Sequence, residues 1–391
     1  MGSDRESLIQ ELRRVLRAGM AGPEALSPAA FDALALRLFA YQYEENPVLR
    51  AYWEEQGVRP GRVRHWLEIP PLPVTAFKQA TVFAGDPAEA AAVFMTSGTT
   101  RGPEERGRHY FRTLDLYRAA LLPPFVHYLL PDGASLPIFV LAPSPAEAPH
   151  SSLSFYFGVI VETLGAPGSR FFWQEGQLLY QELAAALAAM ESAGQPVLLL
   201  GTAFAFVHFL DWLAGEGRRF RLPPGSRAME TGGFKGRSRE MPQANLYALM
   251  ADGLGIPPER IVNQYGMCEL SSQFYEPTLR GGPAGFPRPK QGPPWTRVVI
   301  RDPETLAPAA PGEVGLIQVV DLANLDSAAF LLTQDLGREV PGGFVVLGRA
   351  PGAVARGCSI AADLALGGGQ GAPGAGELPG GMAPPVRGDQ P

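Results

Sequence analysis

A stretch rich in hydroxyl side chains is the part of this sequence whose residue types point most directly to chemistry. Thr96-Ser-Gly-Thr-Thr100 follows a strand-like run over residues 91–95. Backbone N–H groups and Ser or Thr hydroxyls donate hydrogen bonds to phosphate oxygens, and a glycine lets a ligand approach the backbone closely. The stretch is therefore suited to hold a polyphosphate, and it is equally compatible with a solvated turn. It is not a Walker loop, because the spacing G-x-x-x-x-G-K-S/T is absent.

Five more glycine-containing polar segments follow this stretch in the sequence. Each of them alone is also what a turn, a loop or a core residue would look like. Their order behind the hydroxyl-rich stretch favours a nucleotide site built from several loops. The segments are Thr231-Gly-Gly233 with Phe234-Lys235, Asn263-Gln-Tyr-Gly-Met-Cys-Glu269, Pro311-Gly-Glu-Val-Gly315, Thr333-Gln-Asp335-Leu-Gly337 and Gly348-Arg349.

Helical and strand-like patterns alternate around these segments, which indicates an α/β architecture with a substantially parallel sheet. The proline-rich run over residues 69–78 is expected to be extended, because proline does not fit the interior of a helix. Apolar spacing predicts helices over residues 7–17, 28–44 (with Ser27 as N-cap), 113–122, 178–193, 202–213 and 244–254. Short apolar runs predict strands over residues 91–95, 136–141, 159–164, 197–200, 260–264, 297–300, 314–320 and 344–347.

Composition narrows the class of protein. The 391 residues carry a net charge of −6, which gives no sign of a nucleic-acid partner or an anionic-membrane anchor. Two cysteines exclude a disulfide-rich scaffold and a Cys-cluster metal site. The polar N-terminus is unlike a signal peptide, and the longest apolar run, residues 197–210, is too short to span a bilayer. We therefore expect a cytoplasmic protein without a transmembrane segment.

Lysine is rare in this chain. Of 33 basic residues only Lys78, Lys235 and Lys290 are lysines. Lys78 ends the proline-rich run over residues 69–78, and Lys235 follows Thr231-Gly-Gly233 in the first of the five polar segments. A specific requirement for lysine at those two positions would explain why arginine does not stand there.

Taken together, the segments resemble those of the adenylate-forming superfamily, and more narrowly those of the LuxE-type acyl-protein synthetases of bacterial bioluminescence operons. The narrower likeness is carried by Ile69-Pro-Pro-Leu-Pro-Val-Thr-Ala-Phe-Lys78, Arg106-Gly-Arg-His-Tyr110, Glu230-Thr-Gly-Gly-Phe-Lys-Gly236, Tyr265-Gly-Met-Cys-Glu-Leu-Ser-Ser-Gln-Phe-Tyr275 and Gly348-Arg-Ala-Pro-Gly352.

The resemblance implies a division of the chain. Residues 1–347 would form the superfamily's N-terminal adenylation domain, with layered α/β sheets and a small β-rich subdomain. The superfamily's C-terminal domain would be largely absent. Residues 348–365 would be a short remnant of the C-terminal region, and residues 366–391 a disordered tail rich in glycine and proline.

The resemblance also assigns the parts of an ATP site. Thr96, Ser97, Gly98, Thr99 and Thr100 would form the loop around the β- and γ-phosphates, with Arg108 near the place of the loop's usual basic residue. Gly232 and Gly233 would lie against the adenine, and Tyr265, followed by Gly266, would cover its other face. Asp335 would accept both ribose hydroxyls, Arg349 would reach the ribose or the phosphate, and Lys235 would contact phosphate.

The implied chemistry needs a metal ion and an acyl acceptor. Glu269 would be a ligand of Mg²⁺, and Cys358 matches the cysteine that carries the acyl group in this family. A thiol beside Arg356 could have a lowered pKa and attack an acyl-adenylate. The sequence departs from the superfamily at Arg101 in the phosphate loop and at Cys268, where a threonine is usual before the glutamate.

The resemblance thus implies ATP-dependent activation of a fatty acid and transfer of the acyl group to a protein thiol, with an acyl-protein reductase as partner. Two alternatives stay open. One is an acyl- or aryl-CoA ligase similar to phenylacetate–CoA ligase, and the other is a nucleotide-binding scaffold that has lost catalysis. The oligomeric state is not indicated by the sequence.

Overall fold

The computed structural model describes residues 2–20, 26–96, 106–232 and 241–350. Its helices are α1 (Gly2–Ala18), α2 (Pro28–Glu45), α3 (Pro47–Glu55), α4 (Ala76–Gln79), α5 (Asp115–Leu129), α6 (Ser152–Leu164), α7 (Tyr180–Ala193), α8 (Ala203–Gly215) and α9 (Gln243–Leu254). Its strands are β1 (Leu72–Pro73), β2 (Ala92–Met95), β3 (Arg108–Phe111), β4 (Ile138–Leu141), β5 (Arg170–Phe171), β6 (Trp173–Gln174), β7 (Gln177–Leu178), β8 (Leu198–Thr202), β9 (Arg227–Thr231), β10 (Ile261–Tyr265), β11 (Phe274–Tyr275), β12 (Thr296–Arg301), β13 (Val314–Asp321), β14 (Phe330–Val340) and β15 (Gly343–Arg349).

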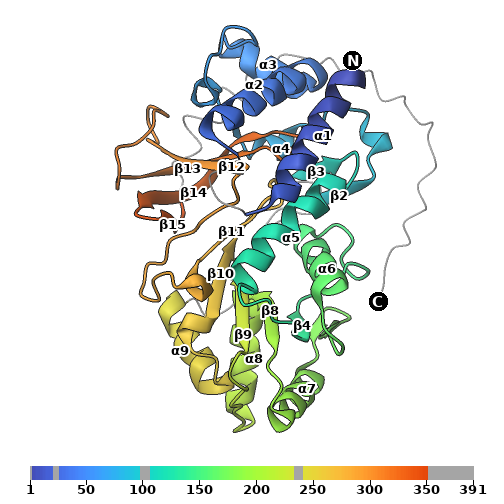
Figure 1. Ribbon diagram of the computed structural model, residues 1–391, viewed down its shortest axis with the longest axis vertical. Coiled ribbons are helices and arrows are strands. Elements are labelled where there is room, and N and C mark those ends of the chain that lie inside the picture. The colour runs from blue at the N-terminus through green and yellow to red at the C-terminus, as the bar shows by residue number, and fades with distance from the viewer. Residues whose placement is uncertain (1, 21–25, 97–105, 233–240, 351–391) are drawn as a thin grey trace, which may run out of the picture.

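A six-stranded sheet forms the lower part of the molecule in Figure 1, in the order β11-β10-β9-β8-β4-β5. The strands from β10 to β5 are parallel, and only β11 runs antiparallel to its neighbour. Alternate side chains of β4 and β8 enter two separate cores, with α5 and α6 on one face and α7, α8 and α9 on the other. Because both faces are covered, β4 and the first three residues of β8 are apolar. The predicted α/β architecture is confirmed.

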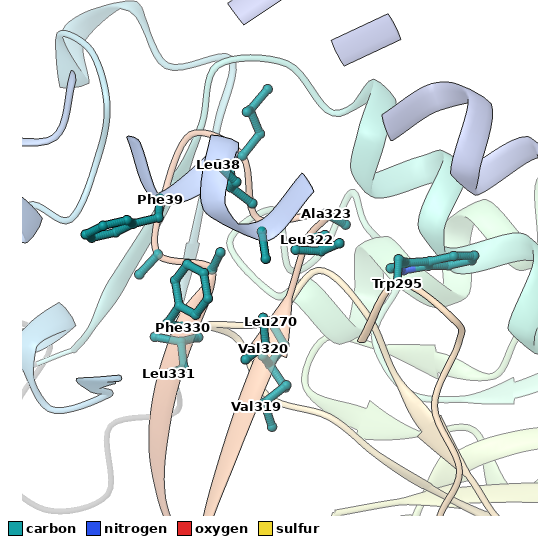
Figure 2. Close-up of a cluster of buried hydrophobic side chains, with 14 of the residues drawn as sticks. Leu38, Phe39, Leu270, Trp295, Val319, Val320, Leu322, Ala323, Phe330 and Leu331 are labelled. Carbon is teal, nitrogen blue, oxygen red and sulfur yellow. The ribbon is translucent and has the colours of Figure 1, made fainter. Parts of the chain in front are cut away.

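A second sheet, in the order β1-β14-β13-β12 with β15 also paired to β14, lies in the upper part with α1 to α4. In Figure 2, Leu38 and Phe39 of α2 lie over Phe330 and Leu331 of β14. Leu270 belongs to the same cluster, so the loop after β10 is anchored in the upper core.

Most of the predicted helices and strands are present, with shifted ends. Ser27 caps α2 as predicted, accepting a hydrogen bond from the Ala30 amide at 3.2 Å. The helix predicted over residues 113–122 starts at Asp115 and continues to Leu129, with Pro123 and Pro124 inside it. The sequence analysis did not predict α3, β9 or β14.

Two predictions about local structure are wrong. Residues 159–164, predicted as a strand, form the end of α6, because Ser151 caps the helix by accepting from the Ser154 amide at 3.1 Å. The β-branched residues of that run pack against the sheet from the helix instead. The run over residues 69–78 is not extended throughout, since the chain turns into α4 once Pro73 has been passed.

Candidate active site

The carboxyl ends of β9 and β10 bring two predicted site residues together. Thr231 pairs with Gln264 in the parallel register, so Gly232 and Tyr265 come next on neighbouring strands. Gly232 has φ +78°, a left-handed conformation that favours glycine, and a Cβ there would meet nothing within 4 Å. Ligands of open α/β sheets bind at the carboxyl ends of the strands. The backbone here leaves open space beside a tyrosine ring.

Tyr265 reaches across to the second sheet. Its hydroxyl donates a hydrogen bond to Oδ2 of Asp335 at 2.9 Å. Burial and the carboxylate of Asp335 raise the pKa of Tyr265 well above its ordinary value, so the phenol remains a donor. The ring is backed by Phe274 and Phe344, with centroids 6.1 and 6.0 Å away. Tyr265 therefore lies at the junction of the two sheets.

Asp335 and Arg349 face each other on neighbouring strands. They are direct partners in the β14–β15 register, and Arg349 Nε lies 3.8 Å from Asp335 Oδ1. The Arg349 side chain is 68% exposed, whereas that of Asp335 is 17% exposed. The interpretation of Asp335 as part of a turn is wrong, because it lies within β14. Thr333 Oγ1 accepts a hydrogen bond from the Asp335 amide at 3.1 Å and helps to fix its backbone.

Glu269 lies in the turn that follows β10 and is 8% exposed. Its backbone carbonyl accepts a hydrogen bond from Asn324 Nδ2 at 2.8 Å. The next residues of the loop are held by Asp321, which accepts from the amides of Ser271 and Ser272 at 2.9 and 2.8 Å. Burial raises the pKa of Glu269 to about 7, against the opposing effect of the positive charges of Arg349 and Lys78.

The donor set at Glu269 fits Mg²⁺ only if a substrate supplies further ligands. The described residues contain no group of three or more His, Cys, Asp or Glu side chains that could hold a metal ion. Mg²⁺ is commonly bound by one or two carboxylates together with substrate phosphates. A single buried carboxyl at the junction meets that requirement.

The hairpin of β2 and β3 holds Thr96, the first residue of the hydroxyl-rich stretch, beside Gly107. The Thr96 amide donates to the carbonyl of Gly107 at 2.9 Å, and the Gly107 amide donates to Thr96 Oγ1 at 2.9 Å. Arg108 pairs with Met95 and is exposed. Ser97, Gly98, Thr99, Thr100, Arg101, Gly233, Lys235 and Cys358 lie outside the described residues, as do residues 366–391.

Cys268 is held in the same loop as Glu269. Its carbonyl accepts a hydrogen bond from Nδ1 of His109 at 2.8 Å. Burial, together with the neighbouring Glu269, raises the pKa of the Cys268 thiol well above its ordinary value. The thiol is therefore protonated near neutral pH. A Cβ at Gly266, two residues earlier, would lie 2.6 Å from Gln264 Nε2, so the Gln264 side chain would have to move.

The structure adds residues that the predicted site lacks. Lys78 acts electrostatically on Glu269, and Asp321 and Asn324 hold the loop that carries it. Two features of the sequence indicated a role for Lys78, namely the scarcity of lysine and its position at the end of the run over residues 69–78. No pattern in the sequence marks Asp321 or Asn324, because their partners are backbone groups some fifty residues earlier.

Residues 24–366 match the acyl-protein synthetase family LuxE. The chain is similar to a long-chain-fatty-acid–luciferin-component ligase of Aliivibrio fischeri, 24% identical over 311 residues, 78% of each chain. A protein of the same name from Vibrio harveyi is 24% identical over 305 residues, 76% of each chain. The structure resembles a 2-hydroxyisobutyryl-CoA ligase solved with 2-HIB-AMP and CoA, with TM-score 0.60 and 15% identity over 85% of this chain and 72% of that one. This likeness confirms the expected fold.

One further observation concerns the helices. Of those in the described ranges, none is both long and apolar enough to cross a membrane.

Proposed function

Because the chain belongs to the acyl-protein synthetase family LuxE and is therefore a ligase, we propose that it uses ATP to activate a fatty acid and passes the acyl group to a protein thiol. The observation that carries this proposal is the meeting of Gly232, Tyr265, Asp335 and Arg349 at the junction of the two sheets. Binding of an adenosine needs an open space, an aromatic ring for the base and a carboxylate for the ribose hydroxyls within reach of that ring.

In this proposal the nucleoside lies between the strand ends. The ring of Tyr265 stacks on the adenine, with Gly232 and Gly233 on the other side. Asp335 accepts the ribose hydroxyls while its second oxygen keeps Tyr265 in place. Arg349, which is exposed and only loosely paired with Asp335, is free to turn toward the ribose or the α-phosphate.

The phosphates would then extend toward Thr96 and Glu269. The β- and γ-phosphates accept hydrogen bonds from the loop Thr96 to Thr100, from Arg108 and from Lys235. Glu269 holds Mg²⁺, which when bound neutralises charge on the phosphate oxygens. The raised pKa of Glu269 falls when a cation binds beside it, so the carboxylate form is favoured in the loaded site.

The first half-reaction joins the fatty acid to AMP. A carboxylate oxygen attacks the α-phosphorus, an O–P bond forms, and the bond to the β-phosphate oxygen breaks to release pyrophosphate. The cations around the site stabilise the charge that gathers on the leaving group. Because Tyr265 and Asp335 hold the nucleoside fixed, the α-phosphorus meets the carboxylate in one orientation.

In the second half-reaction we assign Cys358 as the acceptor of the acyl group. Cys358 belongs to residues 348–365, which follow an adenylation domain over residues 1–347 and precede a tail over residues 366–391. The thiolate attacks the acyl carbonyl, a C–S bond forms, and the bond to AMP breaks. The thiol proton leaves to solvent or to the departing phosphate. The thioester then passes to an acyl-protein reductase, and a cytoplasmic setting would supply the ATP.

Fatty-acid-dependent exchange of labelled pyrophosphate into ATP tests the first half-reaction. The expected result is exchange with at least one long-chain fatty acid, and none with any carboxylate contradicts the proposal. A hydroxylamine-labile acyl label tests the second. We expect Cys358→Ser to lose the label and Cys268→Ala, the matched control, to keep it. Label retained in Cys358→Ser contradicts the acceptor role alone.

A CoA ligase is the second candidate, because the fold is shared with a CoA ligase. The same assay separates the two. Formation of free acyl-CoA, without acyl label on the protein, favours the CoA ligase. A scaffold without catalysis would bind MgATP and give no exchange.

A further inference from the structure

The three lysines of this chain lie in different surroundings. Lys290 is buried, and its Nζ lies 2.8 Å from Oε1 of Glu276. Lys78 is exposed and forms no ion pair with any residue that the structure describes. Lys235 lies outside the described residues. Among the described lysines, Lys78 alone has its charge available for a ligand.

The segment before Lys78 is fixed alongside the strand that carries Asp335. Leu72 and Pro73 pair in parallel with Leu331 and Leu332 of β14, and the Val74 amide donates to the Leu332 carbonyl at 3.0 Å. Beyond these pairs the two segments diverge. The N-terminal one turns into α4, whereas β14 continues to Asp335.

The neighbour of Lys78 ties α4 to two other parts of the site. The Cβ of Phe77 lies 3.3 Å from the position that a Cβ of Gly107 would occupy, and Thr96 Cγ2 lies 3.2 Å from that position. The ring of Phe77 packs edge-on against that of His109, with centroids 5.7 Å apart. His109 in turn donates to the carbonyl of Cys268, directly before Glu269. The helix α4, which carries Lys78, therefore lies where the β2–β3 hairpin and the Glu269 loop meet.

The electrostatics agree with this placement. Lys78 and Arg349 both lie close enough to the Glu269 carboxyl to act on it electrostatically. Lys78 thus acts at the carboxyl from the N-terminal segment, and Arg349 from β15. An anion that approaches Glu269 with its counterion meets two cations, one from α4 and one from β15.

On the basis of the proposed function, we infer that Lys78 binds the triphosphate of ATP at this junction and stabilises the charge that develops on the departing pyrophosphate. A lysine suits this task because its compact charge sits on a flexible stem and can follow phosphate oxygens as they move apart. Arginine, which the chain uses almost everywhere else, prefers a fixed planar partner. The requirement explains why this position keeps a lysine.

The test compares Lys78→Met and Lys78→Gln with wild type, and Arg62→Met serves as the matched control. Arg62 is an exposed cation in the turn after α3. Because Lys78 is exposed, we expect both variants to keep the wild-type melting temperature. We expect pyrophosphate exchange to fall about 100-fold or more, as when one preorganised donor to a transition state is removed. Arg62→Met should exchange as wild type does, and Lys78→Arg should recover part of the lost rate.

Binding measurements separate this inference from the proposed function. We expect Lys78→Met to bind MgATP at least about tenfold more weakly than wild type, and adenosine equally well, since a lost phosphate contact leaves the nucleoside unaffected. Equal MgATP affinity and equal exchange in Lys78→Met and wild type overturn the role of Lys78. If wild-type protein binds MgATP but gives no exchange with any fatty acid, the proposed function is contradicted. The MgATP affinities of Lys78→Met and wild type then still test whether Lys78 binds the triphosphate.

Discussion

Two groups of charged residues border the β9–β10 strand pair, and each contains a lysine. The buried network consists of Glu230, Glu276, Arg288 and Lys290, and the site cluster of Lys78, Glu269, Asp335 and Arg349. In the buried network Glu276 pairs with Lys290 at 2.8 Å and with Arg288 at 3.3 Å, with side chains at most 6% exposed. In the site cluster the one ion pair among the described residues is that of Arg349 with Asp335, at 3.8 Å.

The difference separates the tasks of the two groups. In the buried network Glu276 is paired with both Arg288 and Lys290, so neither cation is left for a ligand. Glu276 also accepts from the Asn263 amide at 3.1 Å, and Glu230 accepts from Asn263 Nδ2 at 2.6 Å and from the Tyr247 hydroxyl at 3.0 Å. The network therefore joins α9 to β9 and β10, the two strands whose carboxyl ends lead to Gly232 and Tyr265. The site cluster keeps its charges apart and available.

The largest expected effect is a loss of stability in a variant that breaks the buried network. Glu276→Ala leaves Arg288 and Lys290 buried without their shared carboxylate. Breaking a buried pair in this way costs about 3–5 kcal/mol of unfolding free energy. Urea unfolding measures it, with Asp335→Ala as the control that removes a carboxylate from the other group. Equal stability of the two variants would show that the groups do not differ as described.

The next effect concerns pH. Burial raises the pKa of Glu230 to about 7, with Glu276 adding to the rise and Lys290 opposing it. The folded-state pKa lies above the unfolded value, so the stabilisation is complete below about pH 4.5 and is lost as pH rises through about 7. The loss is at most about 3 kcal/mol.

Glu230→Gln should remove this dependence. We expect its unfolding free energy to change less than that of wild type between about pH 5 and about pH 8. Glu269→Gln should weaken the dependence in the same direction, because burial raises the pKa of Glu269 to about 7 as well. An unchanged pH profile in Glu230→Gln would assign the dependence to another group.

The smallest effect concerns the site cluster. Asp335→Ala removes the acceptor of the Tyr265 hydroxyl and the proposed ribose ligand. Losing a hydrogen bond to a charged group costs roughly 10- to 100-fold, here in the KM for ATP in the exchange assay. Tyr265→Phe keeps the ring and should lose less. A KM that stays at the wild-type value in Asp335→Ala would remove Asp335 from the nucleotide site.

The sequence predicted the parts of the site better than their arrangement. Apolar runs identified β4 and the first residues of β8, because strands buried on both faces are mostly apolar. β14 escaped prediction, since its half-buried end carries Asp335 and Gly337 and breaks the apolar pattern. The β-branched end of α6 was predicted as a strand, because propensity alone does not register the Ser151 cap.

Contacts between the two sheets were beyond the reach of sequence patterns. The motifs name Tyr265 and Asp335 separately, but their hydrogen bond depends on how the sheets pack. The same holds for Lys78, whose place is set by Phe77 and His109. The roles of Ser97 to Thr100, Lys235 and Cys358 stay predictions.

The pairing of β1 with β14 has a consequence for how the enzyme is made. Leu72 and Leu331 are paired although they are far apart in the sequence. β14 also pairs with β15, which follows it in the chain. Contacts between distant segments form late in folding, because the intervening chain must first be closed into a loop. During synthesis Lys78 leaves the ribosome long before its neighbouring strand exists. The proposed nucleotide site is thus assembled late in translation, and a chain released before β14 would have a parallel sheet without the upper half of the candidate site.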